Sequence, residues 1–324
     1  MIILNKLSSL RAQQRQYSHL GWAMAILLGF SLLLPNLSVL IVRAIFPGFE
    51  QHSWALYFVT YSLFYLLGYP YIYIFLRLRT VAVPPKSKMK PTEFFAAIPV
   101  CIALTYAGSI MGNLLNSVIG LIRGKMPENQ LQSLVDNNDL WVIVLLVVII
   151  GPILEEVIFR KALVDLLYPL GEPACVLFGA LVFGLIHGNF YQFFYAALLG
   201  ALFTLIYCRT GKLRYTILLH MILNFQGSVI SQGVLSLVDK EALMNSDIGA
   251  MLNDNFFGTL IYFGYTFLLL AIAVAGVALL IIGYKKLRLK KSAVPLQKPI
   301  RAALLNPGMI LFLLTGIVLI ALKL

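Results

Sequence analysis

The stretch VIIGPILEEVIFRKAL, residues 148–163, places two adjacent glutamates and an arginine in a run that is otherwise apolar enough to lie in a membrane. An ionisable side chain at the centre of a bilayer costs about 3 kcal/mol or more unless it is paired or faces a cavity. The charges in this stretch therefore require either partners or a function.

The rest of the chain has the composition of a membrane protein. Of its 324 residues, 60% are hydrophobic and 12% are charged, whereas soluble domains are about 45–50% apolar. About 20 apolar residues cross a hydrocarbon core of about 30 Å. We therefore predict an all-α, polytopic transmembrane helix bundle of eight or nine spans. The candidate runs are 20–46, 54–76, 94–122, 140–168, 173–188, 190–210, 214–236, 256–284 and 307–324.

The basic residues predict the orientation of these spans. If the N-terminus is cytoplasmic, 20 of the 25 lysines and arginines fall on the inner side, as the positive-inside rule expects. The formal net charge of +12 then reflects topology and contact with anionic lipid headgroups, and we expect no nucleic acid partner. The three cysteines, Cys101, Cys175 and Cys208, are isolated in apolar runs and are interpreted as packing residues.

Polar residues that suit chemistry occur inside three of the predicted spans. They lie in the segments EEVIFR, FGLIH and HMILN, and are Glu155, Glu156, Arg160, Phe183, His187, His220 and Asn224.

Helical geometry separates the roles of the two glutamates. Glu156 and Arg160 are four residues apart, so they share a helix face and are predicted to form an ion pair. Glu155 lies about 100° further round the helix and is left for chemistry. A carboxylate in a low-dielectric site is a stronger base than one in water, and His187 could hold a water molecule between itself and Glu155.

The HMILN segment suggests a second part of the same site. His220 and Asn224 are one helical turn apart, so both side chains can point at one place and stabilise the oxyanion of a tetrahedral intermediate. Phe183, one turn before His187, is expected to pack beside it. The alternative is that each histidine is a hydrogen-bonded packing residue and that the asparagine joins two helices.

Two further expectations concern the surroundings of the site. His187 ends a run of only about 16 residues, so we predict a hairpin whose Gly188-Asn189 turn is buried at mid-depth, as irregular backbone can be when it is enclosed by protein. The aromatic run YFVTYSLFYLLGYPYIYIF, residues 57–75, is predicted to face lipid and the membrane interfaces.

The order EExxxR, FxxxH and HxxxN, each on its own hydrophobic helix, resembles the CAAX protease and bacteriocin-processing family of intramembrane proteases, which includes the eukaryotic enzymes that trim prenylated CAAX proteins. The resemblance covers about residues 140–236. It implies that catalysis belongs to Glu155 as the base, with His187 beside it, and to His220 and Asn224 as the oxyanion hole. It also implies a supporting role for Glu156, Arg160 and Phe183.

The family has been described both as metalloproteases and as metal-free glutamate proteases. We expect no cofactor, because a base and oxyanion donors already account for the motif residues. The alternative is a zinc ion held by Glu155, His187 and His220, with Glu156 as a further donor.

The sequence thus predicts an intramembrane endopeptidase of a prokaryotic plasma membrane, with its site opening toward the cytoplasmic leaflet. Its substrate would be a membrane-anchored or hydrophobic peptide segment, prenylated or not, and no feature of the chain sets an oligomeric state.

The catalytic core would span 140–236, between spans one to three in 1–139 and spans eight and nine in 237–324. The alternatives are a non-catalytic membrane binding or immunity protein of the same fold, or a proton-coupled transporter, against which we find no inverted repeat.

Overall fold

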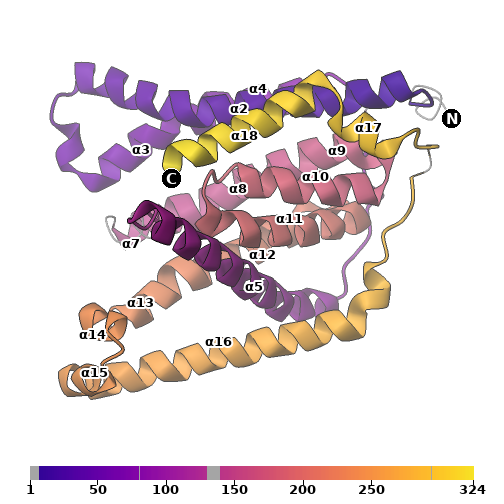
Figure 1. Cartoon of the computed structure of the whole chain (residues 1–324). Coiled ribbons are helices and arrows are strands. Elements are labelled where there is room, and N and C mark those ends of the chain that lie inside the picture. Colours follow the sequence, from indigo (N-terminus) through magenta and orange to yellow (C-terminus); the bar gives the residue numbers. More distant parts are fainter. Residues whose placement is uncertain (1–6, 80, 130–138, 293) are drawn as a thin grey trace.

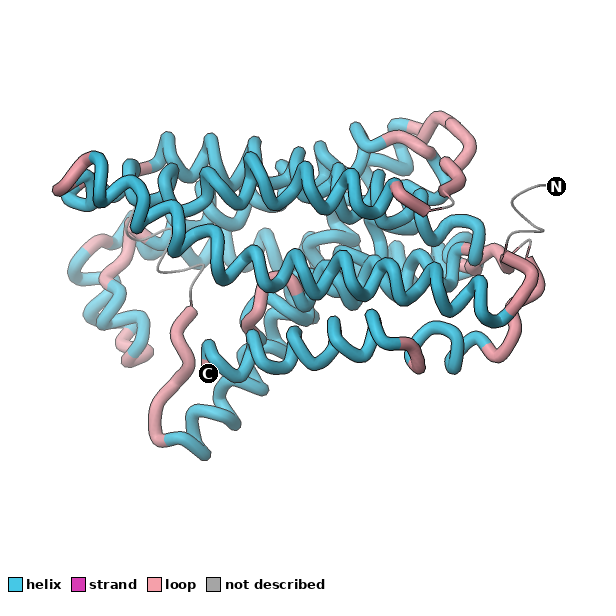
Figure 2. The backbone as a smooth tube through the Cα atoms, turned by 90° about the horizontal axis from the view of Figure 1, so that it is seen from above, coloured by secondary structure: helices cyan, strands magenta, loops and turns pink. Residues whose placement is uncertain are grey.

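The structure is a computed structural model that describes residues 7–79, 81–129, 139–292 and 294–324. Within these residues every regular element is helical (Figures 1 and 2), so the all-α prediction is confirmed. The α-helices are α2 (Leu10–Ile45), α3 (Ser53–Leu63), α4 (Tyr69–Arg77), α5 (Pro91–Arg123), α7 (Leu140–Val142), α8 (Gly151–Glu156), α9 (Leu163–Leu167), α10 (Glu172–Leu185), α11 (Phe190–Thr210), α12 (Leu213–Phe225), α13 (Ser231–Leu235), α14 (Lys240–Met244), α15 (Ile248–Asp254), α16 (Phe256–Gly283), α17 (Pro299–Leu304) and α18 (Pro307–Lys323).

Seven continuous helical segments in the described part of the chain are long and apolar enough to cross a membrane. They are Leu10–Ile45, Trp54–Arg77, Pro91–Arg123, Leu140–Leu170, Phe190–Thr210, Leu213–Leu235 and Phe256–Gly283. Two of the nine predicted runs form shorter apolar helices, Glu172–Leu185 and Pro307–Leu322. The chain is therefore an integral membrane protein, and its described residues supply seven candidate spans and two shorter apolar helices, close to the predicted eight or nine spans.

The helices pack in layers (Figure 1). Helix α2 lies along α18 and α3, α10 lies along α11, and α5 contacts both α11 and α16. Small residues allow the backbones to meet where α2 crosses α18: a Cβ added to Gly21 would lie 2.1 Å from the carbonyl carbon of Gly308. Such close approach at small residues is typical of helices that associate in lipid.

The turn between α10 and α11 is buried. Gly188 and Asn189 are both buried, Gly188 has a φ of +65°, and the Asn189 side chain caps α11 by accepting from the Gln192 backbone N–H. Opposite this turn, a Cβ on Gly112 of α5 would lie 2.3 Å from the Phe190 carbonyl oxygen. Helix α5 continues for roughly 16 Å beyond that point, so the turn lies well short of its end. The predicted buried hairpin is confirmed.

The basic segments predicted to share one side of the membrane lie together at one end of the bundle. Arg77 Nη1 contacts Asp165 Oδ2 at 2.9 Å, and Arg209 Nη2 contacts Glu172 Oε2 at 3.4 Å. Near the N-terminus, Gln16 donates to the Leu166 carbonyl. We call this the basic end; among the described residues it comprises the N-terminal start of α2 and residues 77–79, 81–90, 160–172, 209–214, 285–292 and 294–297. The opposite end carries residues 46–52, 124–129 and 236–255.

Candidate active site

The helix that carries the two glutamates is irregular. Between Leu140 and Leu167 it alternates between α-helix and the wider π-helical turns, which occupy Ile143–Ile150 and Val157–Ala162. Such π-helical segments are rare and occur frequently at functional sites. Glu155 and Glu156 end the short α-helical segment α8 between them.

Glu156 is enclosed and paired, as predicted. Its Oε2 lies 3.0 Å from Nε of Arg160, and both side chains are fully buried. The guanidinium carbon of Arg160 lies 4.4 Å from the centre of the Phe183 ring and 5.4 Å from that of Phe203. The arginine is therefore stabilised by a carboxylate and by two aromatic faces, a combination that suits a cation removed from water.

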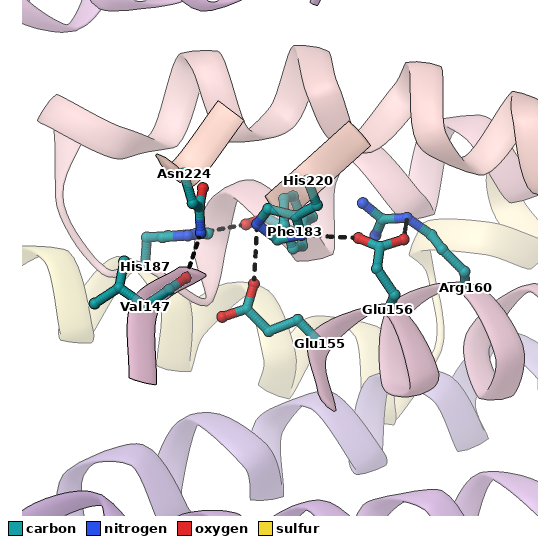
Figure 3. A network of polar contacts seen from close by, with 8 residues as sticks. All are labelled: Val147, Glu155, Glu156, Arg160, Phe183, His187, His220 and Asn224. Carbon is teal, nitrogen blue, oxygen red and sulfur yellow. Dashed lines mark hydrogen bonds and ion pairs between the residues drawn. The ribbon is translucent and has the colours of Figure 1, made fainter. Parts of the chain in front are cut away.

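Glu155 faces a cavity. Its side chain keeps 22% of its exposure, whereas that of Glu156 keeps none. The cavity has a volume of about 540 Å³, and His187, His220 and Asn224 also line it. The structure thus gathers all four residues of the expected catalytic set around one space, as Figure 3 shows.

His220 lies between the two glutamates (Figure 3). Its Nδ1 is 3.1 Å from Oε1 of Glu156, and its Nε2 is 3.9 Å from Oε2 of Glu155. Because a carboxylate only accepts, Nδ1 carries the hydrogen and Nε2 is the atom presented to Glu155. The link between His220 and Glu156 is absent from the sequence prediction, since the two residues are 64 positions apart.

Asn224 is held by a backbone carbonyl on the glutamate helix. Its side-chain amide donates to the Val147 carbonyl oxygen at 2.8 Å (Figure 3). That oxygen is accessible because the Gly151 N–H donates to Leu146 instead, and because Pro152, the next residue along, has no N–H. The amide nitrogen has two hydrogens, so this bond orients Asn224 and leaves its other N–H for a ligand.

Phe183 organises both histidines. Its carbonyl oxygen lies 2.7 Å from Nδ1 of His187, so Nδ1 donates the hydrogen of this bond. The Phe183 ring meets the ring of His187 at 5.4 Å and that of His220 at 5.7 Å, each edge to face. The predicted packing of Phe183 beside His187 is confirmed.

A metal ion is the alternative to a cofactor-free site. In the part of the chain that the structure describes, no three His, Cys, Asp or Glu side chains are grouped so that they could hold a metal ion. Glu156 binds Nδ1 of His220, and the Phe183 carbonyl binds Nδ1 of His187. Bonds of this kind at Nδ1 also orient histidines that bind metals through Nε2, so the expectation that no cofactor is bound stays a prediction.

The prediction that the aromatic run 57–75 faces lipid is wrong for one of its faces. Tyr57, Tyr61, Tyr65 and Tyr69 line the cavity, and successive rings lie 5.9, 5.9 and 5.5 Å apart. We call these four residues the tyrosine wall. Their spacing of four residues was the available signal, because side chains four apart share a helix face. Tyr71, which is off this face, is 47% exposed.

The cavity extends away from the basic end, which is the end that the prediction takes as cytoplasmic. From Glu155 the cavity extends along its own helix to Val142 and along the HMILN helix to Gln232, in both cases away from the basic end. The pairs Glu156–Arg160 and Arg77–Asp165 fill the space on the basic side of the site. The prediction used only the positions of Glu155 and His220 along their helices. It did not consider that the side chains of these two ion pairs lie between the site and the basic end.

Comparisons with known proteins agree with the motifs. Residues 137–226 match the family model described as "Type II CAAX prenyl endopeptidase Rce1-like". The protein named "Putative membrane peptidase YdiL" of Bacillus subtilis (strain 168) is 30% identical over 124 residues, which are 37% of this chain and 48% of that protein. The chain thus aligns with about half the length of this curated relative. No solved structure matches the chain. The residues that match the family model include the EExxxR, FxxxH and HxxxN motifs, so this part of the chain is similar to the CAAX prenyl endopeptidases, and the relative is named as a membrane peptidase.

Proposed function

We propose that this protein is an intramembrane endopeptidase that hydrolyses a peptide bond in a hydrophobic or membrane-anchored segment. The observation that carries the proposal is the meeting of Glu155 with the ring of His220 in a cavity enclosed by membrane-spanning helices. The prenyl endopeptidase family model and the relative named as a membrane peptidase support the same reaction class. A prokaryotic plasma membrane is the proposed location, since the relative is bacterial.

In the first step Glu155 accepts a proton from a water molecule while the water oxygen attacks the carbonyl carbon of the substrate. A base that is only partly exposed and lies in a low-dielectric cavity suits this proton transfer. His187, whose ring is oriented by the Phe183 carbonyl, is proposed to hold the water through Nε2.

The second requirement is stabilisation of the tetrahedral oxyanion. The carboxylates of Glu155 and Glu156 lie on the two sides of the His220 ring, and in this proposal the ring has a hydrogen on each nitrogen when the oxyanion forms. Its Nε2–H would then donate to the oxyanion together with the second N–H of Asn224. Collapse of the intermediate breaks the C–N bond, and Glu155 returns its proton to the leaving nitrogen.

The test is a comparison of new peptide termini in membranes from cells that express the wild-type chain, Glu155→Gln or Glu241→Gln at matched levels. Glu241 is exposed on α14 and lines no part of the cavity, so its variant is the matched control. The proposal expects termini that depend on Glu155 and are unchanged in Glu241→Gln.

Identical termini in all three samples, in a host where the wild-type chain has its physiological effect, would overturn the proposal. If Glu155→Gln kept that effect while bulky substitutions in the cavity removed it, the chain would be a binding protein. Uptake that required a pH gradient and depended on Glu155 and His187 would instead indicate a transporter.

A further inference from the structure

We infer that the substrate enters the Glu155 cavity from the end opposite the basic end, as an uncharged, internal peptide segment. This inference rests on the proposed function, and it concerns the route and the class of substrate. The predicted topology makes the opposite end the non-cytoplasmic one.

The direction of entry follows from which part of each helix lines the cavity. Thr105 and Ser109 lie in the middle of α5, which starts at the basic end. Tyr57 and Tyr61 belong to the early part of the segment Trp54–Arg77, which runs toward the basic end. On helices of both directions the lining therefore reaches toward the opposite end, to Tyr57 on one helix and to Gln232 on another.

The length of the cavity agrees with a route to the surface. Asn129, which follows α5 at the opposite end, belongs to the lining. Val142 lies thirteen residues from Glu155 along the same segment, a distance of roughly 15–20 Å at helical rise. A channel of this length reaches from mid-membrane to the edge of a hydrocarbon core about 30 Å thick.

The two sides of the cavity differ in chemistry. One side is the tyrosine wall, which offers flat apolar faces. The other side offers amide and hydroxyl groups and includes Thr105, Ser109, Gln192, Gln226, Ser228 and Gln232. An extended peptide needs both kinds of surface. Its side chains need apolar contact, and its backbone N–H and C=O groups need hydrogen-bond partners in a low-dielectric site.

The charge of the cavity limits which segment fits. Among the described residues no lysine or arginine lines it, and Glu155 is its one carboxylate. A substrate's C-terminal carboxylate close to the scissile bond would find no lysine or arginine in the described lining and would face Glu155, a costly arrangement at low dielectric. The scissile bond is therefore internal and is flanked by uncharged residues.

Thiol accessibility tests the route without requiring catalysis. Cys101, Cys175 and Cys208 are 0%, 0% and 2% exposed, so the wild-type chain provides a low background. Single variants Ser109→Cys and Gln232→Cys introduce a thiol on the polar side of the cavity. Met244→Cys marks the opposite end, where Met244 is 78% exposed, and Lys88→Cys marks the basic end. Each full-length variant is treated with a membrane-impermeant maleimide in intact cells and again after permeabilisation.

The inference expects Ser109→Cys and Gln232→Cys to be modified under the same condition as Met244→Cys, and Lys88→Cys only under the other condition. Modification of the two cavity thiols together with Lys88→Cys would overturn it, as would complete protection of both while Met244→Cys reacts. The two variants lie on different helices, so misfolding of one leaves the other as the test.

The terminus comparison tests the substrate class. The inference expects Glu155-dependent cleavage more than about five residues from a substrate's C-terminus, with no Asp, Glu, Lys or Arg next to the cleaved bond. Cleavage three residues from a C-terminus, as in CAAX processing, would overturn the inference while supporting the proposed function. Absence of any Glu155-dependent terminus would count against the proposed function, and the thiol experiment would still decide the route.

Discussion

The side-chain amide of Asn224 donates to the backbone carbonyl oxygen of Val147, 2.8 Å away and 77 positions earlier in the chain. This bond joins the HMILN helix to the glutamate helix within the cavity wall. It depends on a carbonyl that lacks its usual helical partner, because Gly151 donates to Leu146 and Pro152 cannot donate. The Gly-Pro pair before the glutamates therefore shapes the site without taking part in the chemistry.

Replacing Asn224 by alanine should reduce turnover by roughly 100-fold, the typical effect of removing one oxyanion donor. Folded yield should change little, since one neutral hydrogen bond contributes about 1 kcal/mol. The measurement is the rate at which Glu155-dependent termini form. Asn116→Ala is the control, because Asn116 is equally an asparagine within a span but lies outside the cavity lining. Equal rates in the two variants would argue against the oxyanion role.

Pro152→Ala should impair turnover through Asn224. The new N–H at position 152 can donate to Val147 in the π-helical register and so compete with the asparagine. Stability should stay the same or rise, because alanine favours helix. Pro173→Ala, at the start of α10, controls for proline removal at a helix start. Wild-type turnover in Pro152→Ala would show that the carbonyl does not position Asn224.

Separating Glu156 from Arg160 should destabilise the fold. Either Glu156→Leu or Arg160→Met leaves a buried charge without its partner, at a cost of about 3–5 kcal/mol. The double variant removes both charges and should lose less than the sum of the single losses. Thermal unfolding of the purified protein in detergent measures this coupling. If the losses in unfolding free energy of the two single variants add up to the loss of the double variant, the 3.0 Å contact between Glu156 and Arg160 contributes no energy as a pair.

The buried hairpin should be sensitive to one methyl group. Gly112→Ala places a Cβ 2.3 Å from the Phe190 carbonyl oxygen and should destabilise the protein by about 1–3 kcal/mol through overpacking. Gly264→Ala has nothing within 4 Å of its Cβ and should stabilise α16 by about 0.5–1 kcal/mol. We expect a lower unfolding temperature for Gly112→Ala and a higher one for Gly264→Ala. An unchanged unfolding temperature in Gly112→Ala would contradict the tight contact between α5 and the hairpin.

The tyrosine wall should influence which bonds are cut. Tyr61→Ala enlarges the cavity beside the proposed substrate path, whereas Tyr71→Ala changes a side chain that is 47% exposed. The first variant should alter the sequences found at Glu155-dependent termini, and the second should leave them unchanged. If Tyr61→Ala leaves the sequences at the cleaved termini unaltered, the tyrosine wall does not take part in substrate recognition.

Features that depend on local geometry could be predicted from the order of residues along the chain. Apolar runs of membrane length predicted the helices, and the spacing of four residues predicted the contact between Glu156 and Arg160. The short run that ends at His187 predicted the buried turn after it. Each of these follows from helical rise and periodicity, which act between residues close in the chain.

The surroundings of the motif residues depend on how the helices pack against one another. The contact of His220 with Glu156 and that of Asn224 with Val147 join different helices, so no local spacing specifies them. Hydropathy did not distinguish Tyr61 on the cavity wall from Tyr71 on the outer surface, because lipid is as apolar as a protein interior. Buried side chains close one end of the cavity and leave the other end open. Packing between helices determines which end is closed, and so it determines the direction of the cavity.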